Sequence, residues 1–501
     1  MKTLPRYLKL IQNETEHFSR EYNLDFFPTR FIVLDYKTMN EVAAFGGFPS
    51  RYPHWRFGME YDRLSKSYSY GLSKIYELVI NNDPCYAYLL EGNSLVDQKL
   101  VMGHVLAHND FFKNNFAFAH TNRQMIDEMA NHATRIKRLM DNHGVEAIES
   151  FIDVCLSLEN LIDPYSVYIQ RPSMDPEPDL GSTRIDSSRI HKFKTKSYLE
   201  SFINPPEYIE KQKSALRDRI DSSHQLPPAP VKDVLAFLIK YAPLNSWERA
   251  VLEIIREEAY YFAPQKMTKI MNEGWATYWH SKFMTEKLLE PSEVINYADV
   301  FSGITYQAPG QLNPYKMGLE LFRHIEERWD KGRFGFDYQN CKDLVTKKQW
   351  NKKVGLGREK IFEVRKHFSD VTFLDEFFTQ EFVEEKLFYT YDYNKRSSSY
   401  VITSKEFKEI KQRLLTQLTN QGQPVIEVLD ANYHNRRELY LIHRHYGVDL
   451  EIPYAKATLE NLQRVWKRPV NLRTIIKGEH QILTWDGSEH TREKISIDAG
   501  I

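Results

Sequence analysis

The stretch Met267–His280, MTKIMNEGWATYWH, places a carboxylate inside an apolar and aromatic run. Glu273, Thr277 and His280 stand at positions i, i+4 and i+7, which share one face of an α-helix. A charged side chain surrounded by apolar residues needs an ionic partner or a metal ion. Glu273 is therefore the residue from which we interpret the rest of the chain.

A second stretch, Met102–Asn115, supplies partners for Glu273. It reads MGHVLAHNDFFKNN, and a helix would present His104 and His108 on the same side because they stand four residues apart. Two imidazoles and a carboxylate suit a first-row divalent ion, above all Zn²⁺. We predict a metal site made of His104, His108 and Glu273. The alternative is a buried polar network without a metal, since histidine pairs at this spacing arise readily by chance.

Composition and charge limit the classes of protein to which the chain can belong. It has 501 residues, which is enough for two or three domains, and its 67 basic and 68 acidic side chains argue against nucleic-acid binding. Three cysteines without a CxxC pair indicate a reduced compartment. The N-terminus lacks an apolar signal region and no stretch is long enough for a membrane span, so we expect a soluble cytoplasmic protein.

The pattern of apolar residues predicts a mainly helical protein in four parts. Residues 1–170 form a helical part that carries the two histidines, and residues 231–390 form a second helical part that carries Glu273. Between them, residues 171–230 are rich in Pro and Ser and predict an insertion or linker. Residues 391–501 alternate β-rich runs with helices, which predicts a small α+β C-terminal domain.

Some local assignments depend on turn signals and short runs. Residues 30–46 predict a helix, and residues 46–68, dense in Gly, Pro and aromatic residues, predict an ordered loop. Residues 247–262 predict a helix that ends before the proline that follows. The runs 75–81 and 84–90 fit either two strands or one interrupted helix, because periodicity cannot separate the two in short apolar runs.

Further polar residues could complete a site. Glu258 lies in the helix that precedes the Glu273 segment. Tyr306, Asn313 and Tyr315 lie in the segment that follows it, whose Gly and Pro residues make turns of a kind that often position ligand-binding groups. The other interpretation of that segment is a packed connection between helices. Glu60 could belong to the wall of a site, although a solvated turn is the simpler interpretation.

The two site segments resemble motifs of the gluzincin metallopeptidases. MNEGWATYWH is similar to the NEGxA helix that provides the third, glutamate ligand in that family, and GHVLAH is similar to its HExxH helix. The resemblance implies a zincin-like helical domain. It departs from the family at the general base, which is the Glu after the first His and is Val105 here. The base must then come from elsewhere, with Glu258, Glu60 and His280 as candidates.

The whole chain resembles the SpoVR family, the stage V sporulation protein R proteins. The motifs that carry the resemblance are GHVLAHNDFFKNN, MNEGWATYWH, NPYKMGLELFR and ERWDKGRFG, and it covers most of residues 5–385. It implies a role in sporulation, in assembly of the peptidoglycan cortex of the spore. It also implies a pathway linked to a serine protein kinase, because relatives are often encoded near a PrkA-type kinase. No settled enzymatic activity comes with the family.

Two main hypotheses of function follow. In the first, the protein is a zinc-dependent hydrolase of an amide-type bond in a peptide or cell-wall precursor, with Glu258 as base and His280 or Tyr306 stabilising the oxyanion. In the second, it is a non-catalytic regulatory or scaffold protein with a degenerate zincin fold, which the valine at the base position favours. A third, a di-metal carboxylate bundle, is disfavoured because the chain lacks two ExxH helices.

Overall fold

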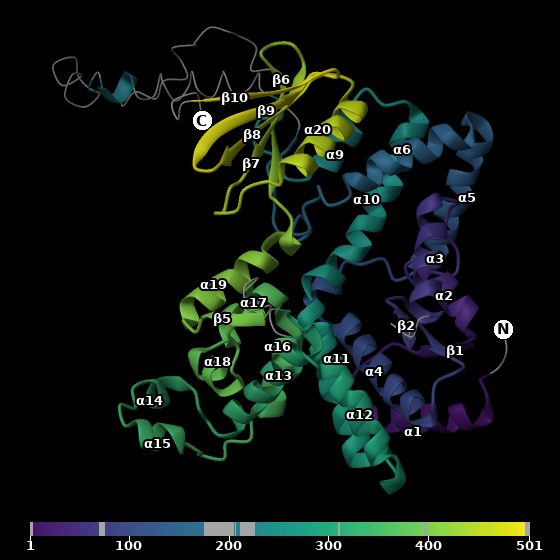
Figure 1. The fold of residues 1–501 in the computed structure, drawn as a ribbon, viewed down its shortest axis with the longest axis vertical. Helices are drawn as coiled ribbons and strands as arrows, with labels where there is room; N and C mark the ends of the chain where they lie inside the picture. The colour runs from purple at the N-terminus through teal and green to yellow at the C-terminus, as the bar shows by residue number, and fades with distance from the viewer. Residues whose placement is uncertain are drawn as a thin grey trace, which may run out of the picture. The chain divides into compact units, whose positions relative to one another are not determined.

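The chain folds into two compact units, each built from two segments that are far apart in the sequence (Figure 1). The first unit comprises Met1–Gly144 and Tyr260–Gly422, and the second comprises Val145–Ala259 and Gln423–Ile501. The computed structural model describes residues 4–69, 76–174, 205, 207–210, 226–308, 311–394, 397 and 399–495. Most of the predicted insertion, residues 171–230, lies outside the described residues.

The N-terminal segment of the first unit packs helices around a three-stranded sheet. Strand β3 is central, parallel to β1 and antiparallel to the edge strand β2, which contacts helix α4. The elements are α1 (Arg6–Glu21), β1 (Thr29–Leu34), α2 (Tyr36–Ala44), α3 (Trp55–Ser69), β2 (Glu77–Ile80), β3 (Cys85–Leu90), α4 (Leu95–Asn114), the 3-10 turn η1 (Phe116–Phe118) and α5 (Met125–His143).

The helix predicted over residues 30–46 is partly wrong. Its beginning forms strand β1, whose sequence TRFIVL is rich in β-branched and aromatic side chains and pairs with β3 along its whole length. Helix α2 covers most of the rest and begins after Asp35, whose side chain accepts a hydrogen bond from the Thr38 N–H. The runs 75–81 and 84–90, which fitted either two strands or one helix, contain the strands β2 and β3.

The prediction of a loop over residues 46–68 is also wrong, because helix α3 begins at Trp55. The turn-forming residues of the segment are concentrated before that position. Beyond it, opposite charges recur at helical spacing, as in the ion pair of 2.5 Å between Glu60 and Arg63. Glu60 therefore lies on the outer side of α3 and is engaged by an arginine.

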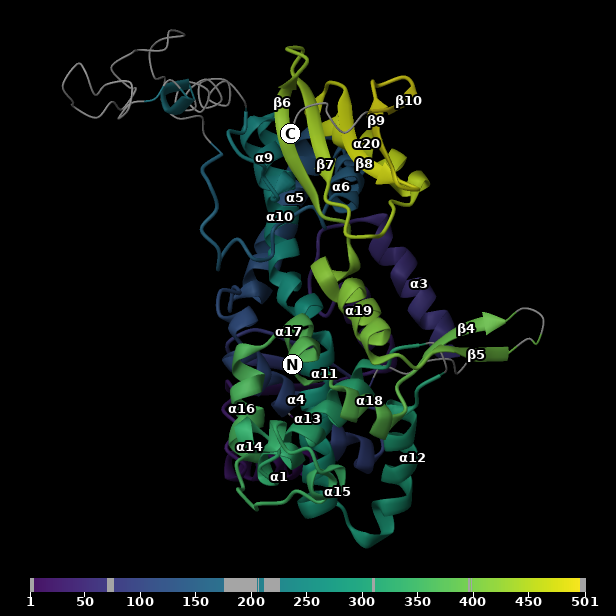
Figure 2. The ribbon, with the colours of Figure 1, turned by 90° about the vertical axis from the view of Figure 1, so that its left-hand side faces the viewer.

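The C-terminal segment of the first unit is almost wholly helical. In Figure 1 helix α11 lies between α13 and α4 and packs against both, and Trp275, Trp279 and Phe322 are fully buried in the shared core. Figure 2 gives the view turned by 90°. The elements are the end of α10 (Ser246–Met267), α11 (Lys269–Phe283), the π-helical turn η4 (Met284–Leu288), the 3-10 turn η5 (Pro291–Glu293), α12 (Val294–Thr305), α13 (Pro314–Asp330), α14 (Gly335–Gln339), α15 (Leu344–Lys348), α16 (Gly357–His367), α17 (Asp370–Phe377), α18 (Gln380–Lys386), the hairpin β4 (Thr390–Asn394) and β5 (Ser399–Ser404), α19 (Phe407–Leu418) and the turn η6 (Thr419–Gly422).

Helix α10 does not end before Pro264, contrary to the prediction, and continues to Met267. A proline removes a single backbone donor, and burial of the flanking Ala263 and Met267 offsets that loss. The break falls instead at Thr268, whose hydroxyl donates a hydrogen bond of 2.7 Å to the Pro264 carbonyl. Helix α11, which carries Glu273, starts at the next residue.

The second unit contains a mixed five-stranded sheet with helices packed on it. Strand order is β10-β9-β8-β7-β6, with β7 and β8 parallel and the other neighbours antiparallel. Helix α20 packs on β8 and β9 and contacts α6. The predicted mainly helical chain with an α+β C-terminal part is confirmed. The elements are α6 (Val145–Ser157), α9 (Val234–Tyr241), the beginning of α10, β6 (Ile426–Tyr433), β7 (Glu438–His443), α20 (Ile452–Trp466), β8 (Val470–Ile476), β9 (Glu479–Trp485) and β10 (His490–Lys494).

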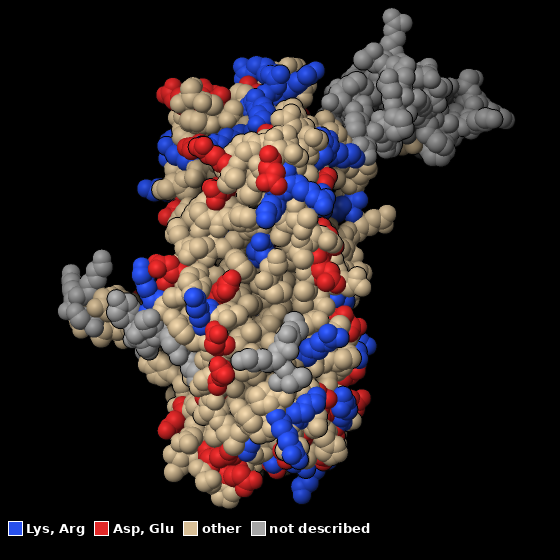
Figure 3. Space-filling view, turned by 90° about the vertical axis from the view of Figure 1, so that its right-hand side faces the viewer, with Lys and Arg blue, Asp and Glu red and all other residues tan. Residues whose placement is uncertain are grey.

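The surface carries charges of both signs. On the face shown in Figure 3, basic and acidic side chains are interspersed, which agrees with the formal net charge of −1. None of the described helices combines the length and the apolar character that crossing a membrane requires.

Candidate metal centre

Helix α4 holds both histidines in the interior of the first unit. It begins with a capping box, in which the Ser94 side chain accepts a hydrogen bond from the Asp97 N–H and the Asp97 carboxylate accepts one from the Ser94 N–H, both of 3.1 Å. Every residue from Val96 to Phe112 is buried. The helix is therefore surrounded by protein, and its polar side chains need partners inside the fold.

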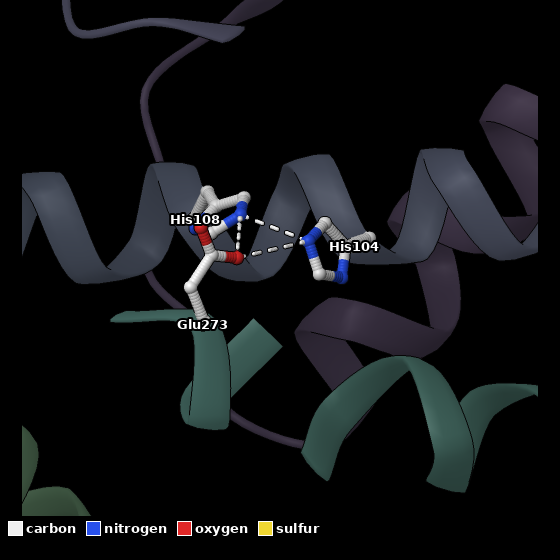
Figure 4. Close-up of side chains that lie close together, drawn as sticks. All are labelled: His104, His108 and Glu273. Atoms are coloured by element: carbon white, nitrogen blue, oxygen red, sulfur yellow. Dashed lines mark hydrogen bonds and ion pairs between the residues drawn. The ribbon is translucent and has the colours of Figure 1, made fainter. Parts of the chain in front are cut away.

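Glu273 of α11 faces the two histidines of α4 (Figure 4). Its Oε2 atom lies 3.6 Å from His104 Nε2 and 3.5 Å from His108 Nε2, and the two Nε2 atoms are 2.9 Å apart. Tetrahedral zinc with ligands at about 2.0–2.1 Å separates its ligand atoms by about 3.3 Å. The three atoms thus form a triangle of a size that could hold one ion, and the structure brings together the three residues that the sequence singled out.

The second nitrogen of each ring has its own partner. His108 Nδ1 lies 2.8 Å from Asn272 Oδ1, which only accepts hydrogen bonds, so the proton of this ring stays on Nδ1. His104 Nδ1 lies 3.0 Å from His280 Nδ1 and can donate to it. In these tautomers both Nε2 lone pairs point toward the Glu273 carboxylate. Three lone pairs that meet in a buried space require a cation between them, either a metal ion or a proton.

Burial and mutual contacts shift the pKa values of all three side chains. Glu273 Oε2 is buried and has no hydrogen-bond partner among the described residues, which is costly for a carboxylate oxygen. Burial, with a contribution from the His108 ring, lowers the pKa of His104 to about 4. Burial acts to raise the pKa of Glu273, but contacts with both histidines outweigh it and hold that pKa below its usual range. Contacts with Glu273 and Asn272 outweigh burial and raise the pKa of His108, so this ring would give up a proton when a metal ion binds.

Comparison with known proteins identifies the family. A family model described as "SpoVR like protein" matches residues 3–423, and one described as "SpoVR-like C-terminal domain" matches residues 424–477. The chain belongs to the SpoVR family. Over 481 residues it is 27% identical to the uncharacterized protein YcgB of Escherichia coli (strain K12), which covers 90% of this chain and 89% of that protein. No solved structure matches the chain.

The gluzincin resemblance of this SpoVR family member rests on its two short motifs alone. The comparisons support the SpoVR family and give no support to a zincin-like fold. The side chain of Val105, which stands where gluzincins have their base, is fully buried in the apolar core. The agreement with gluzincins is therefore limited to the ligand set of two histidines and a glutamate.

A buried polar network joins α4 to α11 in this SpoVR chain. Its members on the two helices, Asp110 and Trp275, stand two residues after His108 and Glu273. Asp110 of α4 is fully buried and accepts a hydrogen bond of 2.8 Å from Trp275 Nε1 of α11. The same carboxylate accepts the Asp25 N–H at 2.8 Å and lies 3.3 Å from the Arg365 guanidinium. A network of this kind fixes how α4 and α11 are aligned along each other.

The N-terminus of α11 is capped from another helix. Asp370, at the start of α17, accepts hydrogen bonds from the Ile270 and Met271 N–H groups at 2.8 and 2.9 Å. No side chain next to α11 in the sequence caps it, since Thr268 makes no such bond. Asp370 therefore supplies the acceptors that the first turn of a helix requires, close to Glu273 in the same helix.

One of the three predicted catalytic residues, His280, contacts the ligand set. It is fully buried against His104, its Nε2 has no hydrogen-bond partner among the described residues, and burial together with the neighbouring rings lowers its pKa well below the usual value. Tyr306 is 70% exposed and lies just after α12. Glu258 is buried in the part of α10 that belongs to the second unit.

Two residues of the SpoVR site complete its surroundings. Tyr315, noted above as one of three polar residues after the site helix, stacks its ring on His104 with centroids 6.2 Å apart, and burial together with the nearby Glu273 carboxylate raises the pKa of its hydroxyl. Glu77, which the sequence did not indicate, has its Oε1 3.9 Å from His104 Nε2. Burial and the nearby carboxylates of Glu273 and Asp97 raise the pKa of Glu77 to about 7.

Proposed function

We propose that this SpoVR family member is a metal-dependent hydrolase of an amide-type bond, with the ion held by His104, His108 and Glu273. The observation that supports it is the convergence of three side chains on one buried point, where Asn272 holds the proton of His108 on Nδ1 and His280 can accept that of His104. A bound Zn²⁺ ion would supply a Lewis acid and increase the acidity of a water ligand.

The chain's own residues have distinct tasks in this proposal. Asn272 and His280 orient the two imidazoles, as outer partners of metal-binding histidines usually do. Tyr315, beside both Glu273 and His104, has a hydroxyl that can donate a hydrogen bond to the oxyanion that develops on a carbonyl. It takes the role that the sequence suggested for Tyr306.

The biological process in this proposal rests on the family alone. Spore-cortex peptidoglycan contains peptide amide bonds, so we propose a peptide or a cell-wall precursor as the substrate. A pathway linked to a serine protein kinase would be the setting in which the activity is used.

A second function, that of a non-catalytic regulatory or scaffold protein, is favoured by one observation. Val105, at the position of the gluzincin base, is fully buried in apolar core and leaves no carboxylate there. In this case a metal ion bound by His104 and Glu273 would serve to hold α4 against α11, and its loss would reduce stability instead of activity.

The first test is the metal content of the purified protein, measured by elemental mass spectrometry without chelator. We expect near-stoichiometric divalent metal in the native chain and little in His104→Ala, His108→Ala or Glu273→Gln. His324→Ala, which alters a buried histidine of α13 outside the ligand set, should retain the metal. A folded native chain without metal, and unable to take up Zn²⁺, would contradict the proposal.

A second measurement separates hydrolase from scaffold. The metal-loaded protein is incubated with a library of peptides and N-acyl amides, and new amines are detected by mass spectrometry. Cleavage that disappears in Glu273→Gln supports the hydrolase. Full metal occupancy and a lower melting temperature after metal removal, with no cleavage of any amide, would support the scaffold.

A further inference from the structure

A cavity of about 150 Å³ adjoins the candidate metal centre. The polar residues His104, Glu77 and Tyr315 line it, so any group that enters it lies beside the ligand set. An apolar protein cavity of about this volume accommodates a benzene-sized molecule. The space is therefore large enough for a leucine-like or phenyl group.

The rest of the cavity wall is mainly apolar. Leu100 and Val101 come from α4, and Val300 and Ile304 come from α12. None of the described residues that line the cavity is a lysine or an arginine, whereas Asp97 adds a carboxylate. Such a wall favours an apolar group on a neutral or cationic molecule and disfavours phosphates and carboxylates, which would be buried without a counter-charge.

Glu77 stands beside the ligand set and is not part of it. Its carboxylate is 3.9 Å from His104 Nε2, yet the atoms that converge closely enough to hold one ion come from His104, His108 and Glu273. Strand β2 places Glu77 on the wall of the cavity. A carboxylate in this position can hydrogen-bond to a water or substrate that occupies the cavity next to His104.

We propose, on the basis of the hydrolase function above, that this cavity binds a compact branched or aromatic group of a neutral amide substrate and that Glu77 accepts the proton of the attacking water. The water oxygen bonds to the carbonyl carbon while one water proton passes to the Glu77 carboxylate. The carbon–nitrogen bond then breaks, and that proton moves to the leaving nitrogen. The products are a carboxylic acid and an amine, and Glu77 regains its ionised form.

The cavity is tested by ligand binding to the cobalt-substituted protein, followed by its visible spectrum. The probes are acetohydroxamate, 3-methylbutanohydroxamate and inorganic phosphate. The branched probe has three more carbon atoms than acetohydroxamate, so we expect it to bind about ten- to fifty-fold more tightly. Phosphate should leave the spectrum unchanged at concentrations that saturate the branched probe.

Substitutions in the cavity wall test whether the tighter binding of the branched hydroxamate arises in this cavity. Leu100→Trp should remove the advantage of the branched probe while cobalt content and acetohydroxamate binding persist, and Val300→Phe provides the same test from α12 if the tryptophan variant does not fold. Leu95→Trp, at an exposed leucine on the same helix, should behave like the native chain. An unchanged preference in folded Leu100→Trp or Val300→Phe would overturn the assignment of the cavity.

Glu77→Gln tests the proton acceptor without an activity assay. Hydroxamates bind metals as anions and give up a proton on binding, so we expect this variant to bind both hydroxamates about tenfold more weakly at unchanged cobalt content and unchanged probe preference. Loss of cobalt would make Glu77 a ligand and overturn its role as base, while unchanged affinity would overturn it as well. A native chain that binds no cobalt would overturn the proposed metal site itself. A chain that binds cobalt but has equal affinity for both hydroxamates would overturn only the proposal that the cavity binds a branched or aromatic group.

Discussion

Gly274 of α11 lies directly against Gly318 of α13, and a Cβ atom on Gly274 would overlap the Gly318 backbone. The contact is reciprocal, because a Cβ on Gly318 would overlap the backbone of α11 at the Ile270 carbonyl. The two helices therefore approach more closely than side chains would permit. Since Gly274 follows Glu273, this contact determines where the ligand carboxylate stands.

Gly274→Ala should destabilise the protein and weaken metal binding together. Alanine favours a helix over glycine by about 1 kcal/mol, but forcing the helices apart should cost about 1–3 kcal/mol beyond that gain. Thermal unfolding and a zinc-binding titration measure the two effects. Gly303→Ala, in α12, is the matched control, because a Cβ there meets no heavy atom within 4 Å. Equal stability of the two variants would show that α11 and α13 can separate without cost.

Asn272→Ala should lower zinc affinity with little effect on folding. Its carbonyl holds the proton of His108 on Nδ1, and the loss of such an outer partner typically reduces metal affinity by about 10–100-fold. Competition with a chromophoric chelator provides the measurement. Asn340→Ala, which alters an exposed asparagine of the same unit, should leave the affinity unchanged. Native affinity in Asn272→Ala would mean that His108 needs no orienting partner.

Asp370→Ala should destabilise the first unit by about 2–4 kcal/mol, because two buried N–H groups of α11 lose their acceptor. Denaturant unfolding gives the value. In the same helix, Asp375→Ala removes a mostly exposed carboxylate that pairs with Lys411 and should change stability by less than about 1 kcal/mol. A small effect at Asp370 would imply that water replaces its carboxylate at the helix end.

Val105→Glu restores the gluzincin sequence pattern, yet we expect it to unfold the protein. The valine is fully buried in apolar core, and an unpaired carboxylate there should cost several kcal/mol. Circular dichroism and thermal melting are the measurements. Val345→Glu, at a position that is 65% exposed, should change stability by about 0.5 kcal/mol or less. A folded Val105→Glu chain that gains peptide hydrolysis would instead support a degenerate zincin.

His443, in the second unit, should make stability depend on pH. Burial, aided by His445, lowers the pKa of His443 to about 4, whereas an unfolded chain has about 6.5. Above pH 6.5 both states hold a neutral ring and the contribution is constant. As the pH falls from 6.5 toward 4, only the unfolded chain binds a proton, so the free energy of unfolding should decrease by about 2 kcal/mol at pH 5.

Urea unfolding at pH 7.5 and pH 5 measures this loss. His443→Gln retains a group that can hydrogen-bond to Thr474, whose hydroxyl lies 2.9 Å from His443 Nδ1, but it cannot titrate. The variant should therefore lose about 2 kcal/mol less than the native chain between the two pH values. An identical loss in both proteins would assign the pH dependence to other groups.

The meeting of His104, His108 and Glu273 could be predicted from the sequence because all three residues stand on long helices. On such a helix, spacing alone puts His104 and His108 on one face. The apolar residues that flank Glu273 in the sequence indicate that it lies in the interior. The α+β character of the C-terminal part likewise follows from short β-rich runs that alternate with helical ones. In each case the deciding interactions are local.

Glu77 and Asp370 could not be predicted, because their roles depend on contacts between distant segments. Glu77 begins a four-residue edge strand without a motif, and its pairing with β3 brings it beside His104. Asp370 caps a helix that starts about a hundred residues earlier in the chain. The helix break near Pro264 was misplaced for a similar reason, since burial around the proline outweighs its local preference.

The division of each unit between two distant segments has a consequence for synthesis on the ribosome. His104 and His108 leave the exit tunnel long before Glu273, because the first part of the second unit is translated between them. At about 5–20 residues per second the delay is on the order of ten to thirty seconds. During that interval the nascent chain offers two histidines without their carboxylate, so stable uptake of an ion must await the later segment.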